Sequence, residues 1–224
     1  LPESLRAPAR DPFTLKRFNP FSSLLALSRE RLVLPILLVI TLYTLSQSLM
    51  QCTWALYTEF RYGWSPKMIG ISIFVLGAAI TITQGWILPR LSAKLSPTHL
   101  VFAGLFCGFT ALIGIGFSTA GTFLLPLLAL FSLMGVVGPT LQSVISRTGS
   151  PTTQGVRLGA ASSLNSFTGA ISPLLGTPLL FFTSQSAPTD LAAGTPYFLA
   201  ALLVLAAIIL TILSPSQADA ENTH

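Results

Sequence analysis

The residues best suited to chemistry are amides, hydroxyls and aromatic rings that recur at helical spacing inside an apolar sequence. Tyr43, Gln47, Gln51 and Trp54 follow one another at i, i+4, i+8 and i+11, which places them on one face of a helix. An amide left unpaired in hydrocarbon costs about 2–7 kcal/mol, so this face should point at protein or at a water-filled cavity. The alternative is hydrogen bonding between helices with no ligand involved.

Other apolar stretches contribute three further polar side chains to the candidate cavity lining: Gln84, Gln142 and Asn165. Amides and hydroxyls bind molecules, but they do not readily transfer protons or attack carbon. No Asp, Glu, Lys, Arg or His lies near the middle of an apolar stretch, where such residues usually mark proton relays. His99 and His224 are isolated, and Cys52 and Cys107 lie on different stretches, so we expect no enzyme activity, no cofactor and no metal site.

The elements that must position these side chains are long apolar segments. Of the 224 residues, 51% are hydrophobic and only 8% are charged, against roughly 25% charged residues in an ordinary soluble domain. A helix needs roughly 20 mostly apolar residues to cross the hydrocarbon core of a bilayer. We therefore predict an all-α polytopic membrane protein whose transmembrane bundle, residues 32–214, has six spans at about 32–58, 67–88, 98–118, 123–146, 156–182 and 196–214.

The basic residues predict the orientation of these spans. If the amino terminus is cytoplasmic, Arg61 and Lys67 are the only ones of the 12 basic residues that fall on the outer side. This asymmetry follows the positive-inside rule and predicts an integral membrane protein with both termini in the cytoplasm. It also argues against a nucleic-acid partner as the reason for the net charge of +5. Glu59 and Arg61, at the outer end of the first span, are expected to be solvated, and the alternative is an ion pair between them.

The segments that flank the bundle are polar. Residues 1–31 are predicted to form a cytoplasmic linker, rich in Pro and Arg, with a short amphipathic helix that begins at Asn19-Pro20. The alternative for that helix is a loop that contains some leucines. Residues 215–224 are predicted to form a short cytoplasmic tail.

Small residues and proline predict how the spans pack. Gly104 and Gly108 have the G-x-x-x-G spacing that lets helices approach closely. Pro139 lies inside the fourth span, where it removes a backbone hydrogen bond and favours a kink. A neighbouring helix must then satisfy the freed carbonyl.

The fifth and sixth spans differ sharply in polarity. The fifth carries Gly159, Gly169 and Pro173 among several Ser and Thr residues, so we expect it to lie centrally, enclosed by other helices. The sixth is almost uniformly aliphatic over residues 198–213 and is expected to face lipid. This contrast predicts a helical bundle around a polar path.

Several of these residues, taken together, resemble a known family. The segments concerned are Gly135, Pro139, Leu141-Gln142, Ser146-Arg147, Gln154-Gly155, Gly159, Ser163-Leu164 and Pro173-Leu174-Leu175, together with Trp54, Glu59, Arg61, Trp64, Ile69-Gly70-Ile71-Ser72 and Gln84 followed by Arg90, Leu91 and Lys94. They resemble the carboxy-terminal half of tetracycline-resistance-type efflux proteins of the major facilitator superfamily. The resemblance extends over nearly the whole chain.

The resemblance implies one six-helix half of a twelve-span transporter. Such a transporter exports small molecules against proton entry by alternating access about a central cavity. The implied partners are the lipid bilayer, an amino-terminal six-helix half on the same or a separate chain, a small-molecule substrate and protons. The implied location is the bacterial inner membrane. The resemblance also implies a set of cytoplasmic gating or structural residues: Arg90, Lys94, Arg147, Gln154, Gly155 and Arg157.

Two features depart from the family pattern. Tetracycline exporters of this type have an acidic residue in the third span of this half, and the matching position here is Gly108, which argues against export of metal-chelated tetracycline. The loop at residues 148–153 also lacks the acidic residues common there. Because no amino-terminal half is present in the sequence, we expect a fragment or truncation. The alternative function is a non-transporting remnant, or a membrane assembly partner of another transporter half.

Overall fold

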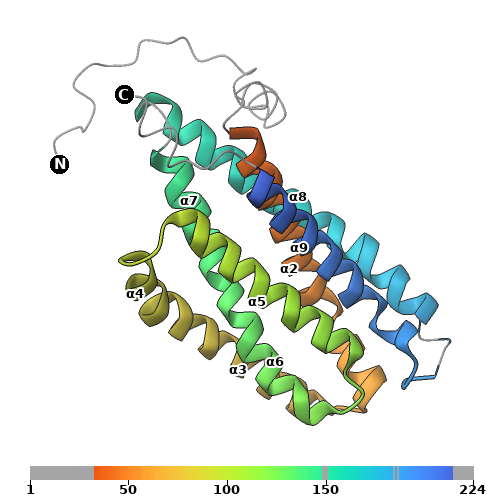
Figure 1. Cartoon of the computed structure of the whole chain (residues 1–224). Helices are drawn as coiled ribbons and strands as arrows, with labels where there is room; N and C mark the ends of the chain where they lie inside the picture. Colours follow the sequence, from red (N-terminus) through yellow and green to blue (C-terminus); the bar gives the residue numbers. More distant parts are fainter. Residues whose placement is uncertain (1–32, 148–150, 184, 186, 214–224) are drawn as a thin grey trace.

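The computed structural model describes residues 33–147, 151–183, 185 and 187–213, and every regular element in these ranges is a helix (Figure 1). The long helices run along a common direction and form one bundle. Within the described residues, six helical stretches are long and apolar enough to cross a membrane: Leu34–Tyr62, Pro66–Ser92, Pro97–Phe117, Gly121–Ser146, Leu158–Thr183 and Leu191–Leu213. The all-α fold predicted from the sequence is confirmed. The predicted helix at Asn19-Pro20 and the carboxy-terminal tail lie outside the described residues.

The helices have the following bounds: α2 Val33–Tyr62, α3 Pro66–Ile82, α4 Leu88–Ser92, α5 Pro97–Phe117, α6 Leu124–Ser132, α7 Val137–Arg147, α8 Pro151–Thr183 and α9 Thr195–Leu213. Four short elements interrupt or precede them: the π-helical turn η2 Thr83–Ile87 and the 3₁₀ turns η3 Gly121–Phe123, η4 Leu133–Val136 and η5 Leu191–Gly194. The second span is thus α3, η2 and α4 in sequence, and the fourth is η3, α6, η4 and α7.

Local sequence signals explain where two spans begin. Ser65 accepts a hydrogen bond from the backbone N–H of Met68 and Pro66 follows it, the usual start of a helix. Ser96 and Pro97 repeat this arrangement at the start of α5. Between α2 and α3 the chain reverses at Gly63, whose φ of 62° is accessible to glycine at little cost.

Hydrogen bonds between helices hold the bundle together where α2, α5 and α9 meet. The Ser46 hydroxyl donates to the Ala200 carbonyl oxygen at 2.9 Å, and the Tyr57 hydroxyl donates to the Ile115 carbonyl oxygen at 2.8 Å. Both donors belong to α2, and both are buried. Since lipid offers no competing partner, such bonds orient helices that have no hydrophobic reason to associate.

The predicted G-x-x-x-G residues lie at a close helix contact. A Cβ atom added to Gly104 would stand 2.8 Å from Cγ2 of both Val136 and Val137, and one added to Gly108 would overlap the side chain of Met134. The backbone of α5 therefore approaches η4 and α7 more closely than any larger residue would allow.

The fifth span is not enclosed by the described helices. Although α8 packs on α2, α7 and α9, its face carrying Ser162, Ser166 and Gly169 is exposed. A Cβ atom added at Gly159 or Gly169 would find nothing within 4 Å. The prediction of a central α8 is therefore wrong for this bundle, because small polar residues indicate a protein contact without indicating which helices provide it.

The sixth span does not face only outward. Tyr197, Ala200, Val204 and Ile208 of α9 are buried against α2 and α5, while the opposite face remains exposed, with Leu202 60% exposed. Small alanines on the buried face allow this packing. The prediction that the sixth span faces lipid is therefore wrong for this face, because an aliphatic composition alone does not distinguish a lipid-facing surface from a packed one.

Arg61 lies at one end of the bundle and joins three segments of the chain there. Its Nε donates to the Ser118 carbonyl oxygen at 2.7 Å and its Nη1 donates to the Asp190 carbonyl oxygen at 2.9 Å. The residue is only 7% exposed, so the expectation of a solvated Arg61 is wrong. We call this end of the bundle the Arg61 end.

Candidate functional site

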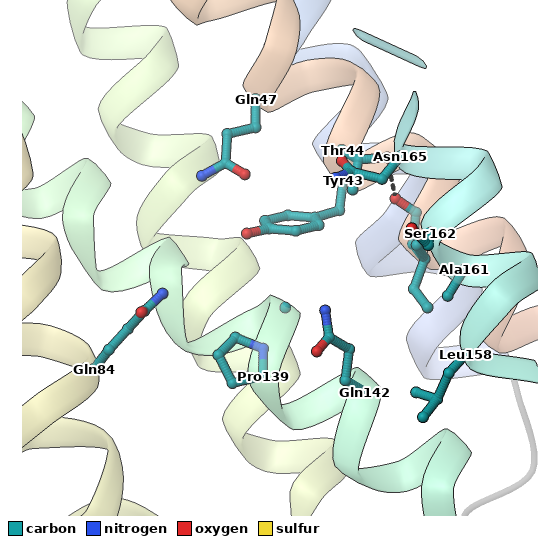
Figure 2. Close-up of a pocket in the computed structure, with 12 residues that line it drawn as sticks. Tyr43, Thr44, Gln47, Gln84, Pro139, Gln142, Leu158, Ala161, Ser162 and Asn165 are labelled. Carbon is teal, nitrogen blue, oxygen red and sulfur yellow. Dashed lines mark hydrogen bonds between the residues drawn. The ribbon is translucent and has the colours of Figure 1, made fainter. Parts of the chain in front are cut away.

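A cavity of about 610 Å³ opens between α2 and parts of the second, fourth and fifth spans (Figure 2). Its walls come from α2, η2, α7 and α8, and they consist of Ile40, Tyr43, Thr44, Gln47, Gln84, Gly138, Pro139, Gln142, Leu158, Ala161, Ser162 and Asn165. Since these residues are widely separated in the sequence, only the packing of the helices brings them together.

The lining combines amides and hydroxyls with aliphatic surface. The Gln47, Gln84 and Gln142 amides offer both donors and acceptors, as does the Asn165 amide. Ile40 and other aliphatic groups provide apolar contact. Among the residues whose side chains the structure describes, none that lines the cavity is charged. Such a surface can bind a neutral or amphiphilic molecule by hydrogen bonding and packing, and it contains no acid–base pair for catalysis.

Among the described residues, no group of three or more His, Cys, Asp and Glu side chains is placed to hold a metal ion. Cys52 and Cys107 are free thiols.

Five of the seven predicted cavity residues line this space: Tyr43, Gln47, Gln84, Gln142 and Asn165. Figure 2 shows the Tyr43 ring extending between Gln47 and Gln142. Gly138 lies opposite Tyr43, and a Cβ atom there would contact the Tyr43 hydroxyl oxygen at 3.5 Å. Glycine at this position therefore leaves room for the tyrosine side chain.

The structure places Gln51 and Trp54 elsewhere. Gln51 is exposed on α2 and does not line the cavity. Trp54 is 3% exposed, donates from Nε1 to the Ser72 hydroxyl oxygen at 2.9 Å, and meets Trp64 edge-on with 6.3 Å between the ring centroids. At 1.5 Å per residue, Trp54 lies about 16 Å along the helix from Tyr43, beyond the cavity, and Gln51 is rotated by about 80° from Tyr43.

Some residues that line the cavity were not among the predicted lining residues. Thr44 and Ser162 belong to polar parts of the first and fifth spans, so their polarity was a usable signal. Ile40, Leu158 and Ala161 are ordinary aliphatic residues of a membrane helix, and nothing in their type or spacing distinguishes them from lipid-facing or core positions.

The second and fourth spans meet at the cavity through side chains of the π-helical turn. The Gln84 Nε2 donates to the Gly135 carbonyl oxygen at 3.1 Å. Beside it, the buried Thr83 and Ser132 hydroxyl oxygens are 3.3 Å apart. In an α-helix the N–H of residue 139 would donate to the carbonyl of Gly135, and residue 139 is proline. The neighbouring helix thus provides the donor that the sequence analysis required.

Of the predicted cytoplasmic residues, Arg90, Lys94 and Gly155 are described in full, and none of these three lines the cavity. Arg90 is exposed, stacks on the Trp86 ring with its guanidinium carbon 4.1 Å from the ring centroid, and donates to the Trp86 carbonyl oxygen at 2.9 Å. Lys94 and Gly155 are exposed. Arg147, Gln154 and Arg157 belong to α7 and α8, but their side chains lie outside the described part of the structure, so their gating role remains a prediction.

Comparison of the sequence with known proteins identifies homologues of this chain. The chain is 31% identical over 194 residues to the class D tetracycline resistance protein of Salmonella ordonez, a match that covers 84% of the chain and 48% of that protein. It is 33% identical over 145 residues to the class B protein of Escherichia coli, covering 63% of the chain and 36% of that protein. The chain is homologous to the tetracycline resistance efflux proteins of the major facilitator superfamily.

More distant relatives extend over more of the chain. The Hippocampus abundant transcript 1 protein of Mus musculus is 23% identical over 241 residues, covering 98% of the chain and 49% of that protein. No family model matches the chain. The chain spans about half the length of the curated relatives it matches. Six membrane-spanning helices and these homologues make the chain an integral membrane protein of a transporter family, not an enzyme family.

Proposed function

We propose that this chain provides the carboxy-terminal half of a proton-coupled small-molecule exporter that works by alternating access. The observation that carries the proposal is the polar cavity, whose described lining residues are uncharged and whose walls come from four helical segments of the membrane-spanning bundle. Homology to tetracycline resistance proteins supports export of a drug-like molecule. The same homology supports the bacterial inner membrane as its location, with both termini cytoplasmic.

The exposed faces of α3 and α8 support a second six-helix half as partner. The second span is the least buried, with 11% of its most apolar stretch buried, against 50% for the third. On α8 the exposed face carries Ser162, Asn165 and Ser166. Hydroxyls and amides are poorly suited to lipid contact, so a facing protein half or a shared aqueous cavity suits this surface better.

The double substitution Gln47→Leu and Gln142→Leu tests the cavity as the substrate path. Each substitution removes a cavity amide while leaving an aliphatic side chain that a membrane helix tolerates. Losing two hydrogen bonds of about 1 kcal/mol each should lower transport by about tenfold or more. The measurement is accumulation of a neutral or amphiphilic fluorescent compound that the parent protein exports, in cells that express this half together with its amino-terminal half, normalised to the amount of protein in the membrane.

Gln51→Leu is the matched control, because Gln51 is an amide on the same helix that does not line the cavity. It should leave transport within twofold of the parent protein. The assignment of the substrate path is contradicted if the double variant transports as the parent does, or if Gln51→Leu causes an equal loss.

A second function, an assembly partner that does not transport, is favoured by the exposed polar face of α8, because Ser162, Asn165 and Ser166 could contact a partner half in a complex that does not transport. Reconstitution into liposomes separates the two functions. The exporter requires flux driven by a proton gradient when both halves are present. A half that restores no flux in any such pairing, although it inserts and folds, is an assembly partner only.

A further inference from the structure

We propose that Gln84 is a positioning residue whose amide holds the bend of the fourth span by donating to the backbone carbonyl of Gly135. By this bend we mean the 3₁₀ break η4, Leu133–Val136, which separates the α-helical parts α6 and α7; directly after it, α7 meets the cavity through Gly138, Pro139 and Gln142. A role for this contact in transport rests on the proposed function, whereas the experiment that tests the contact itself does not require transport.

The backbone of the fourth span explains why a donor from outside is needed. Residues Leu133–Val136 form a 3₁₀ turn between two α-helical parts, and the ring of Pro139 follows four residues after Gly135. Proline offers no N–H, so the usual α-helical donor to the Gly135 carbonyl is missing. A buried carbonyl that loses its partner is costly to the folded state, so a donor from a neighbouring segment favours the conformation in which it can reach that carbonyl.

The second span is shaped to provide that donor. Gln84 lies in the π turn Thr83–Ile87, where one extra residue per turn changes the direction of the side chains. Its Nε2 is 3.1 Å from the Gly135 oxygen, and the adjacent contact of Thr83 with Ser132 anchors the same two segments. A π turn thus faces a 3₁₀ turn, and side-chain hydrogen bonds join them.

This junction is part of the cavity wall. Gln84, Pro139 and Gln142 all line the cavity, so a change in the bend moves α7 relative to η2 at the place where a ligand would lie. Gln84 therefore positions Gln142 and the Pro139 ring. A residue that served only to bind ligand would leave the bend unchanged when replaced.

The test measures the bend directly by electron paramagnetic resonance between two spin labels on the fourth span. Phe123 and Ser143 are exposed positions on either side of the bend and can be replaced by labelled cysteines after Cys52 and Cys107 are changed to alanine. Gln84→Met removes the donor and keeps the length of the side chain. We expect it to shift and broaden the distance distribution, while Gln51→Met leaves the distribution unchanged.

Pro139→Ala provides the decisive comparison, because it returns a backbone N–H to the Gly135 carbonyl. In that background Gln84→Met should have little further effect on the distance distribution, so the two substitutions should be strongly non-additive. If Gln84→Met alone prevents folding, Pro139→Ala should restore the protein. The proposal is overturned if Gln84→Met leaves the distribution unchanged, if its effect is the same with and without Pro139, or if Pro139→Ala fails to restore a protein that Gln84→Met unfolds.

Discussion

Gly194→Ala is expected to destabilise the Arg61 end of the bundle by more than about 3 kcal/mol, because backbone atoms, not flexible side chains, fill the space beside Gly194. A Cβ atom there would overlap the backbone carbonyl of Gly116, at the end of α5. Gly116 itself faces Phe198, whose Cε1 would stand 2.5 Å from an added Cβ. Neither α5 nor α9 can move away without opening the buried contact between them.

The measurement is the midpoint of thermal unfolding of the purified protein in detergent, together with its abundance in membranes. Gly77→Ala is the control: it is the same substitution in the interior of α3, where an added Cβ finds nothing within 4 Å. There alanine should be neutral or stabilise the helix by about 0.5–1 kcal/mol. A Gly194→Ala protein that unfolds at the same temperature as the parent contradicts the close contact between the end of α5 and η5.

Gly108→Asp is expected to cause a comparable loss of folded protein. This substitution restores the acidic residue that the resemblance assigns to the third span of tetracycline exporters. Here, however, Gly108 is buried, and its added Cβ would overlap Met134, with Cγ of Met134 at 2.8 Å. The substitution therefore adds both a steric overlap and a buried carboxylate, and an uncompensated buried charge costs about 3–5 kcal/mol.

A size exchange separates these two costs. Met134→Ala should largely rescue Gly108→Ala, because it removes the overlapping side chain. It should rescue Gly108→Asp only in part, because the carboxylate stays buried without a partner. The midpoint of thermal unfolding in detergent measures the stability of Gly108→Ala and of Gly108→Asp, each with and without Met134→Ala. Equal stability of Gly108→Asp and the parent would mean that the third span can accommodate an acidic group after all.

The fold was predictable because its signals are strong and local. Long apolar runs with few charges predict spans whatever their packing, and Ser65-Pro66 and Ser96-Pro97 mark the starts of two of them. Proline at residue 139 likewise predicted a carbonyl in need of a partner. These inferences depend on the energetic cost of a polar group in lipid, which is large enough to outweigh details of packing.

The site was predictable only in part, because packing decides which face of a helix meets a cavity and how far the cavity extends along it. Tyr43 and Gln47 lie beside the cavity, whereas Trp54, further along almost the same face, fills a contact with Ser72. The π turn at Thr83–Ile87 carries no sequence signal that we recognised, although it positions Gln84. Likewise, the polarity of α8 indicated a protein contact but not that its exposed face is left uncovered by the described helices.

Reactivity of single cysteines tests most directly whether an aqueous cavity lies inside a membrane-spanning bundle. Ser162→Cys and Leu202→Cys are compared in a background without Cys52 and Cys107, using a charged, membrane-impermeant thiol reagent on opened membrane vesicles. Both positions are exposed on the bundle, but Ser162 lines the cavity and Leu202 lies on the outer face of α9. Because the thiolate is the reactive form and lipid prevents ionisation, rapid modification of the thiol at 162 and little at 202 is the predicted result. Equal reactivity at the two positions, whether both fast or both slow, would contradict the presence of an aqueous cavity inside a membrane-spanning bundle.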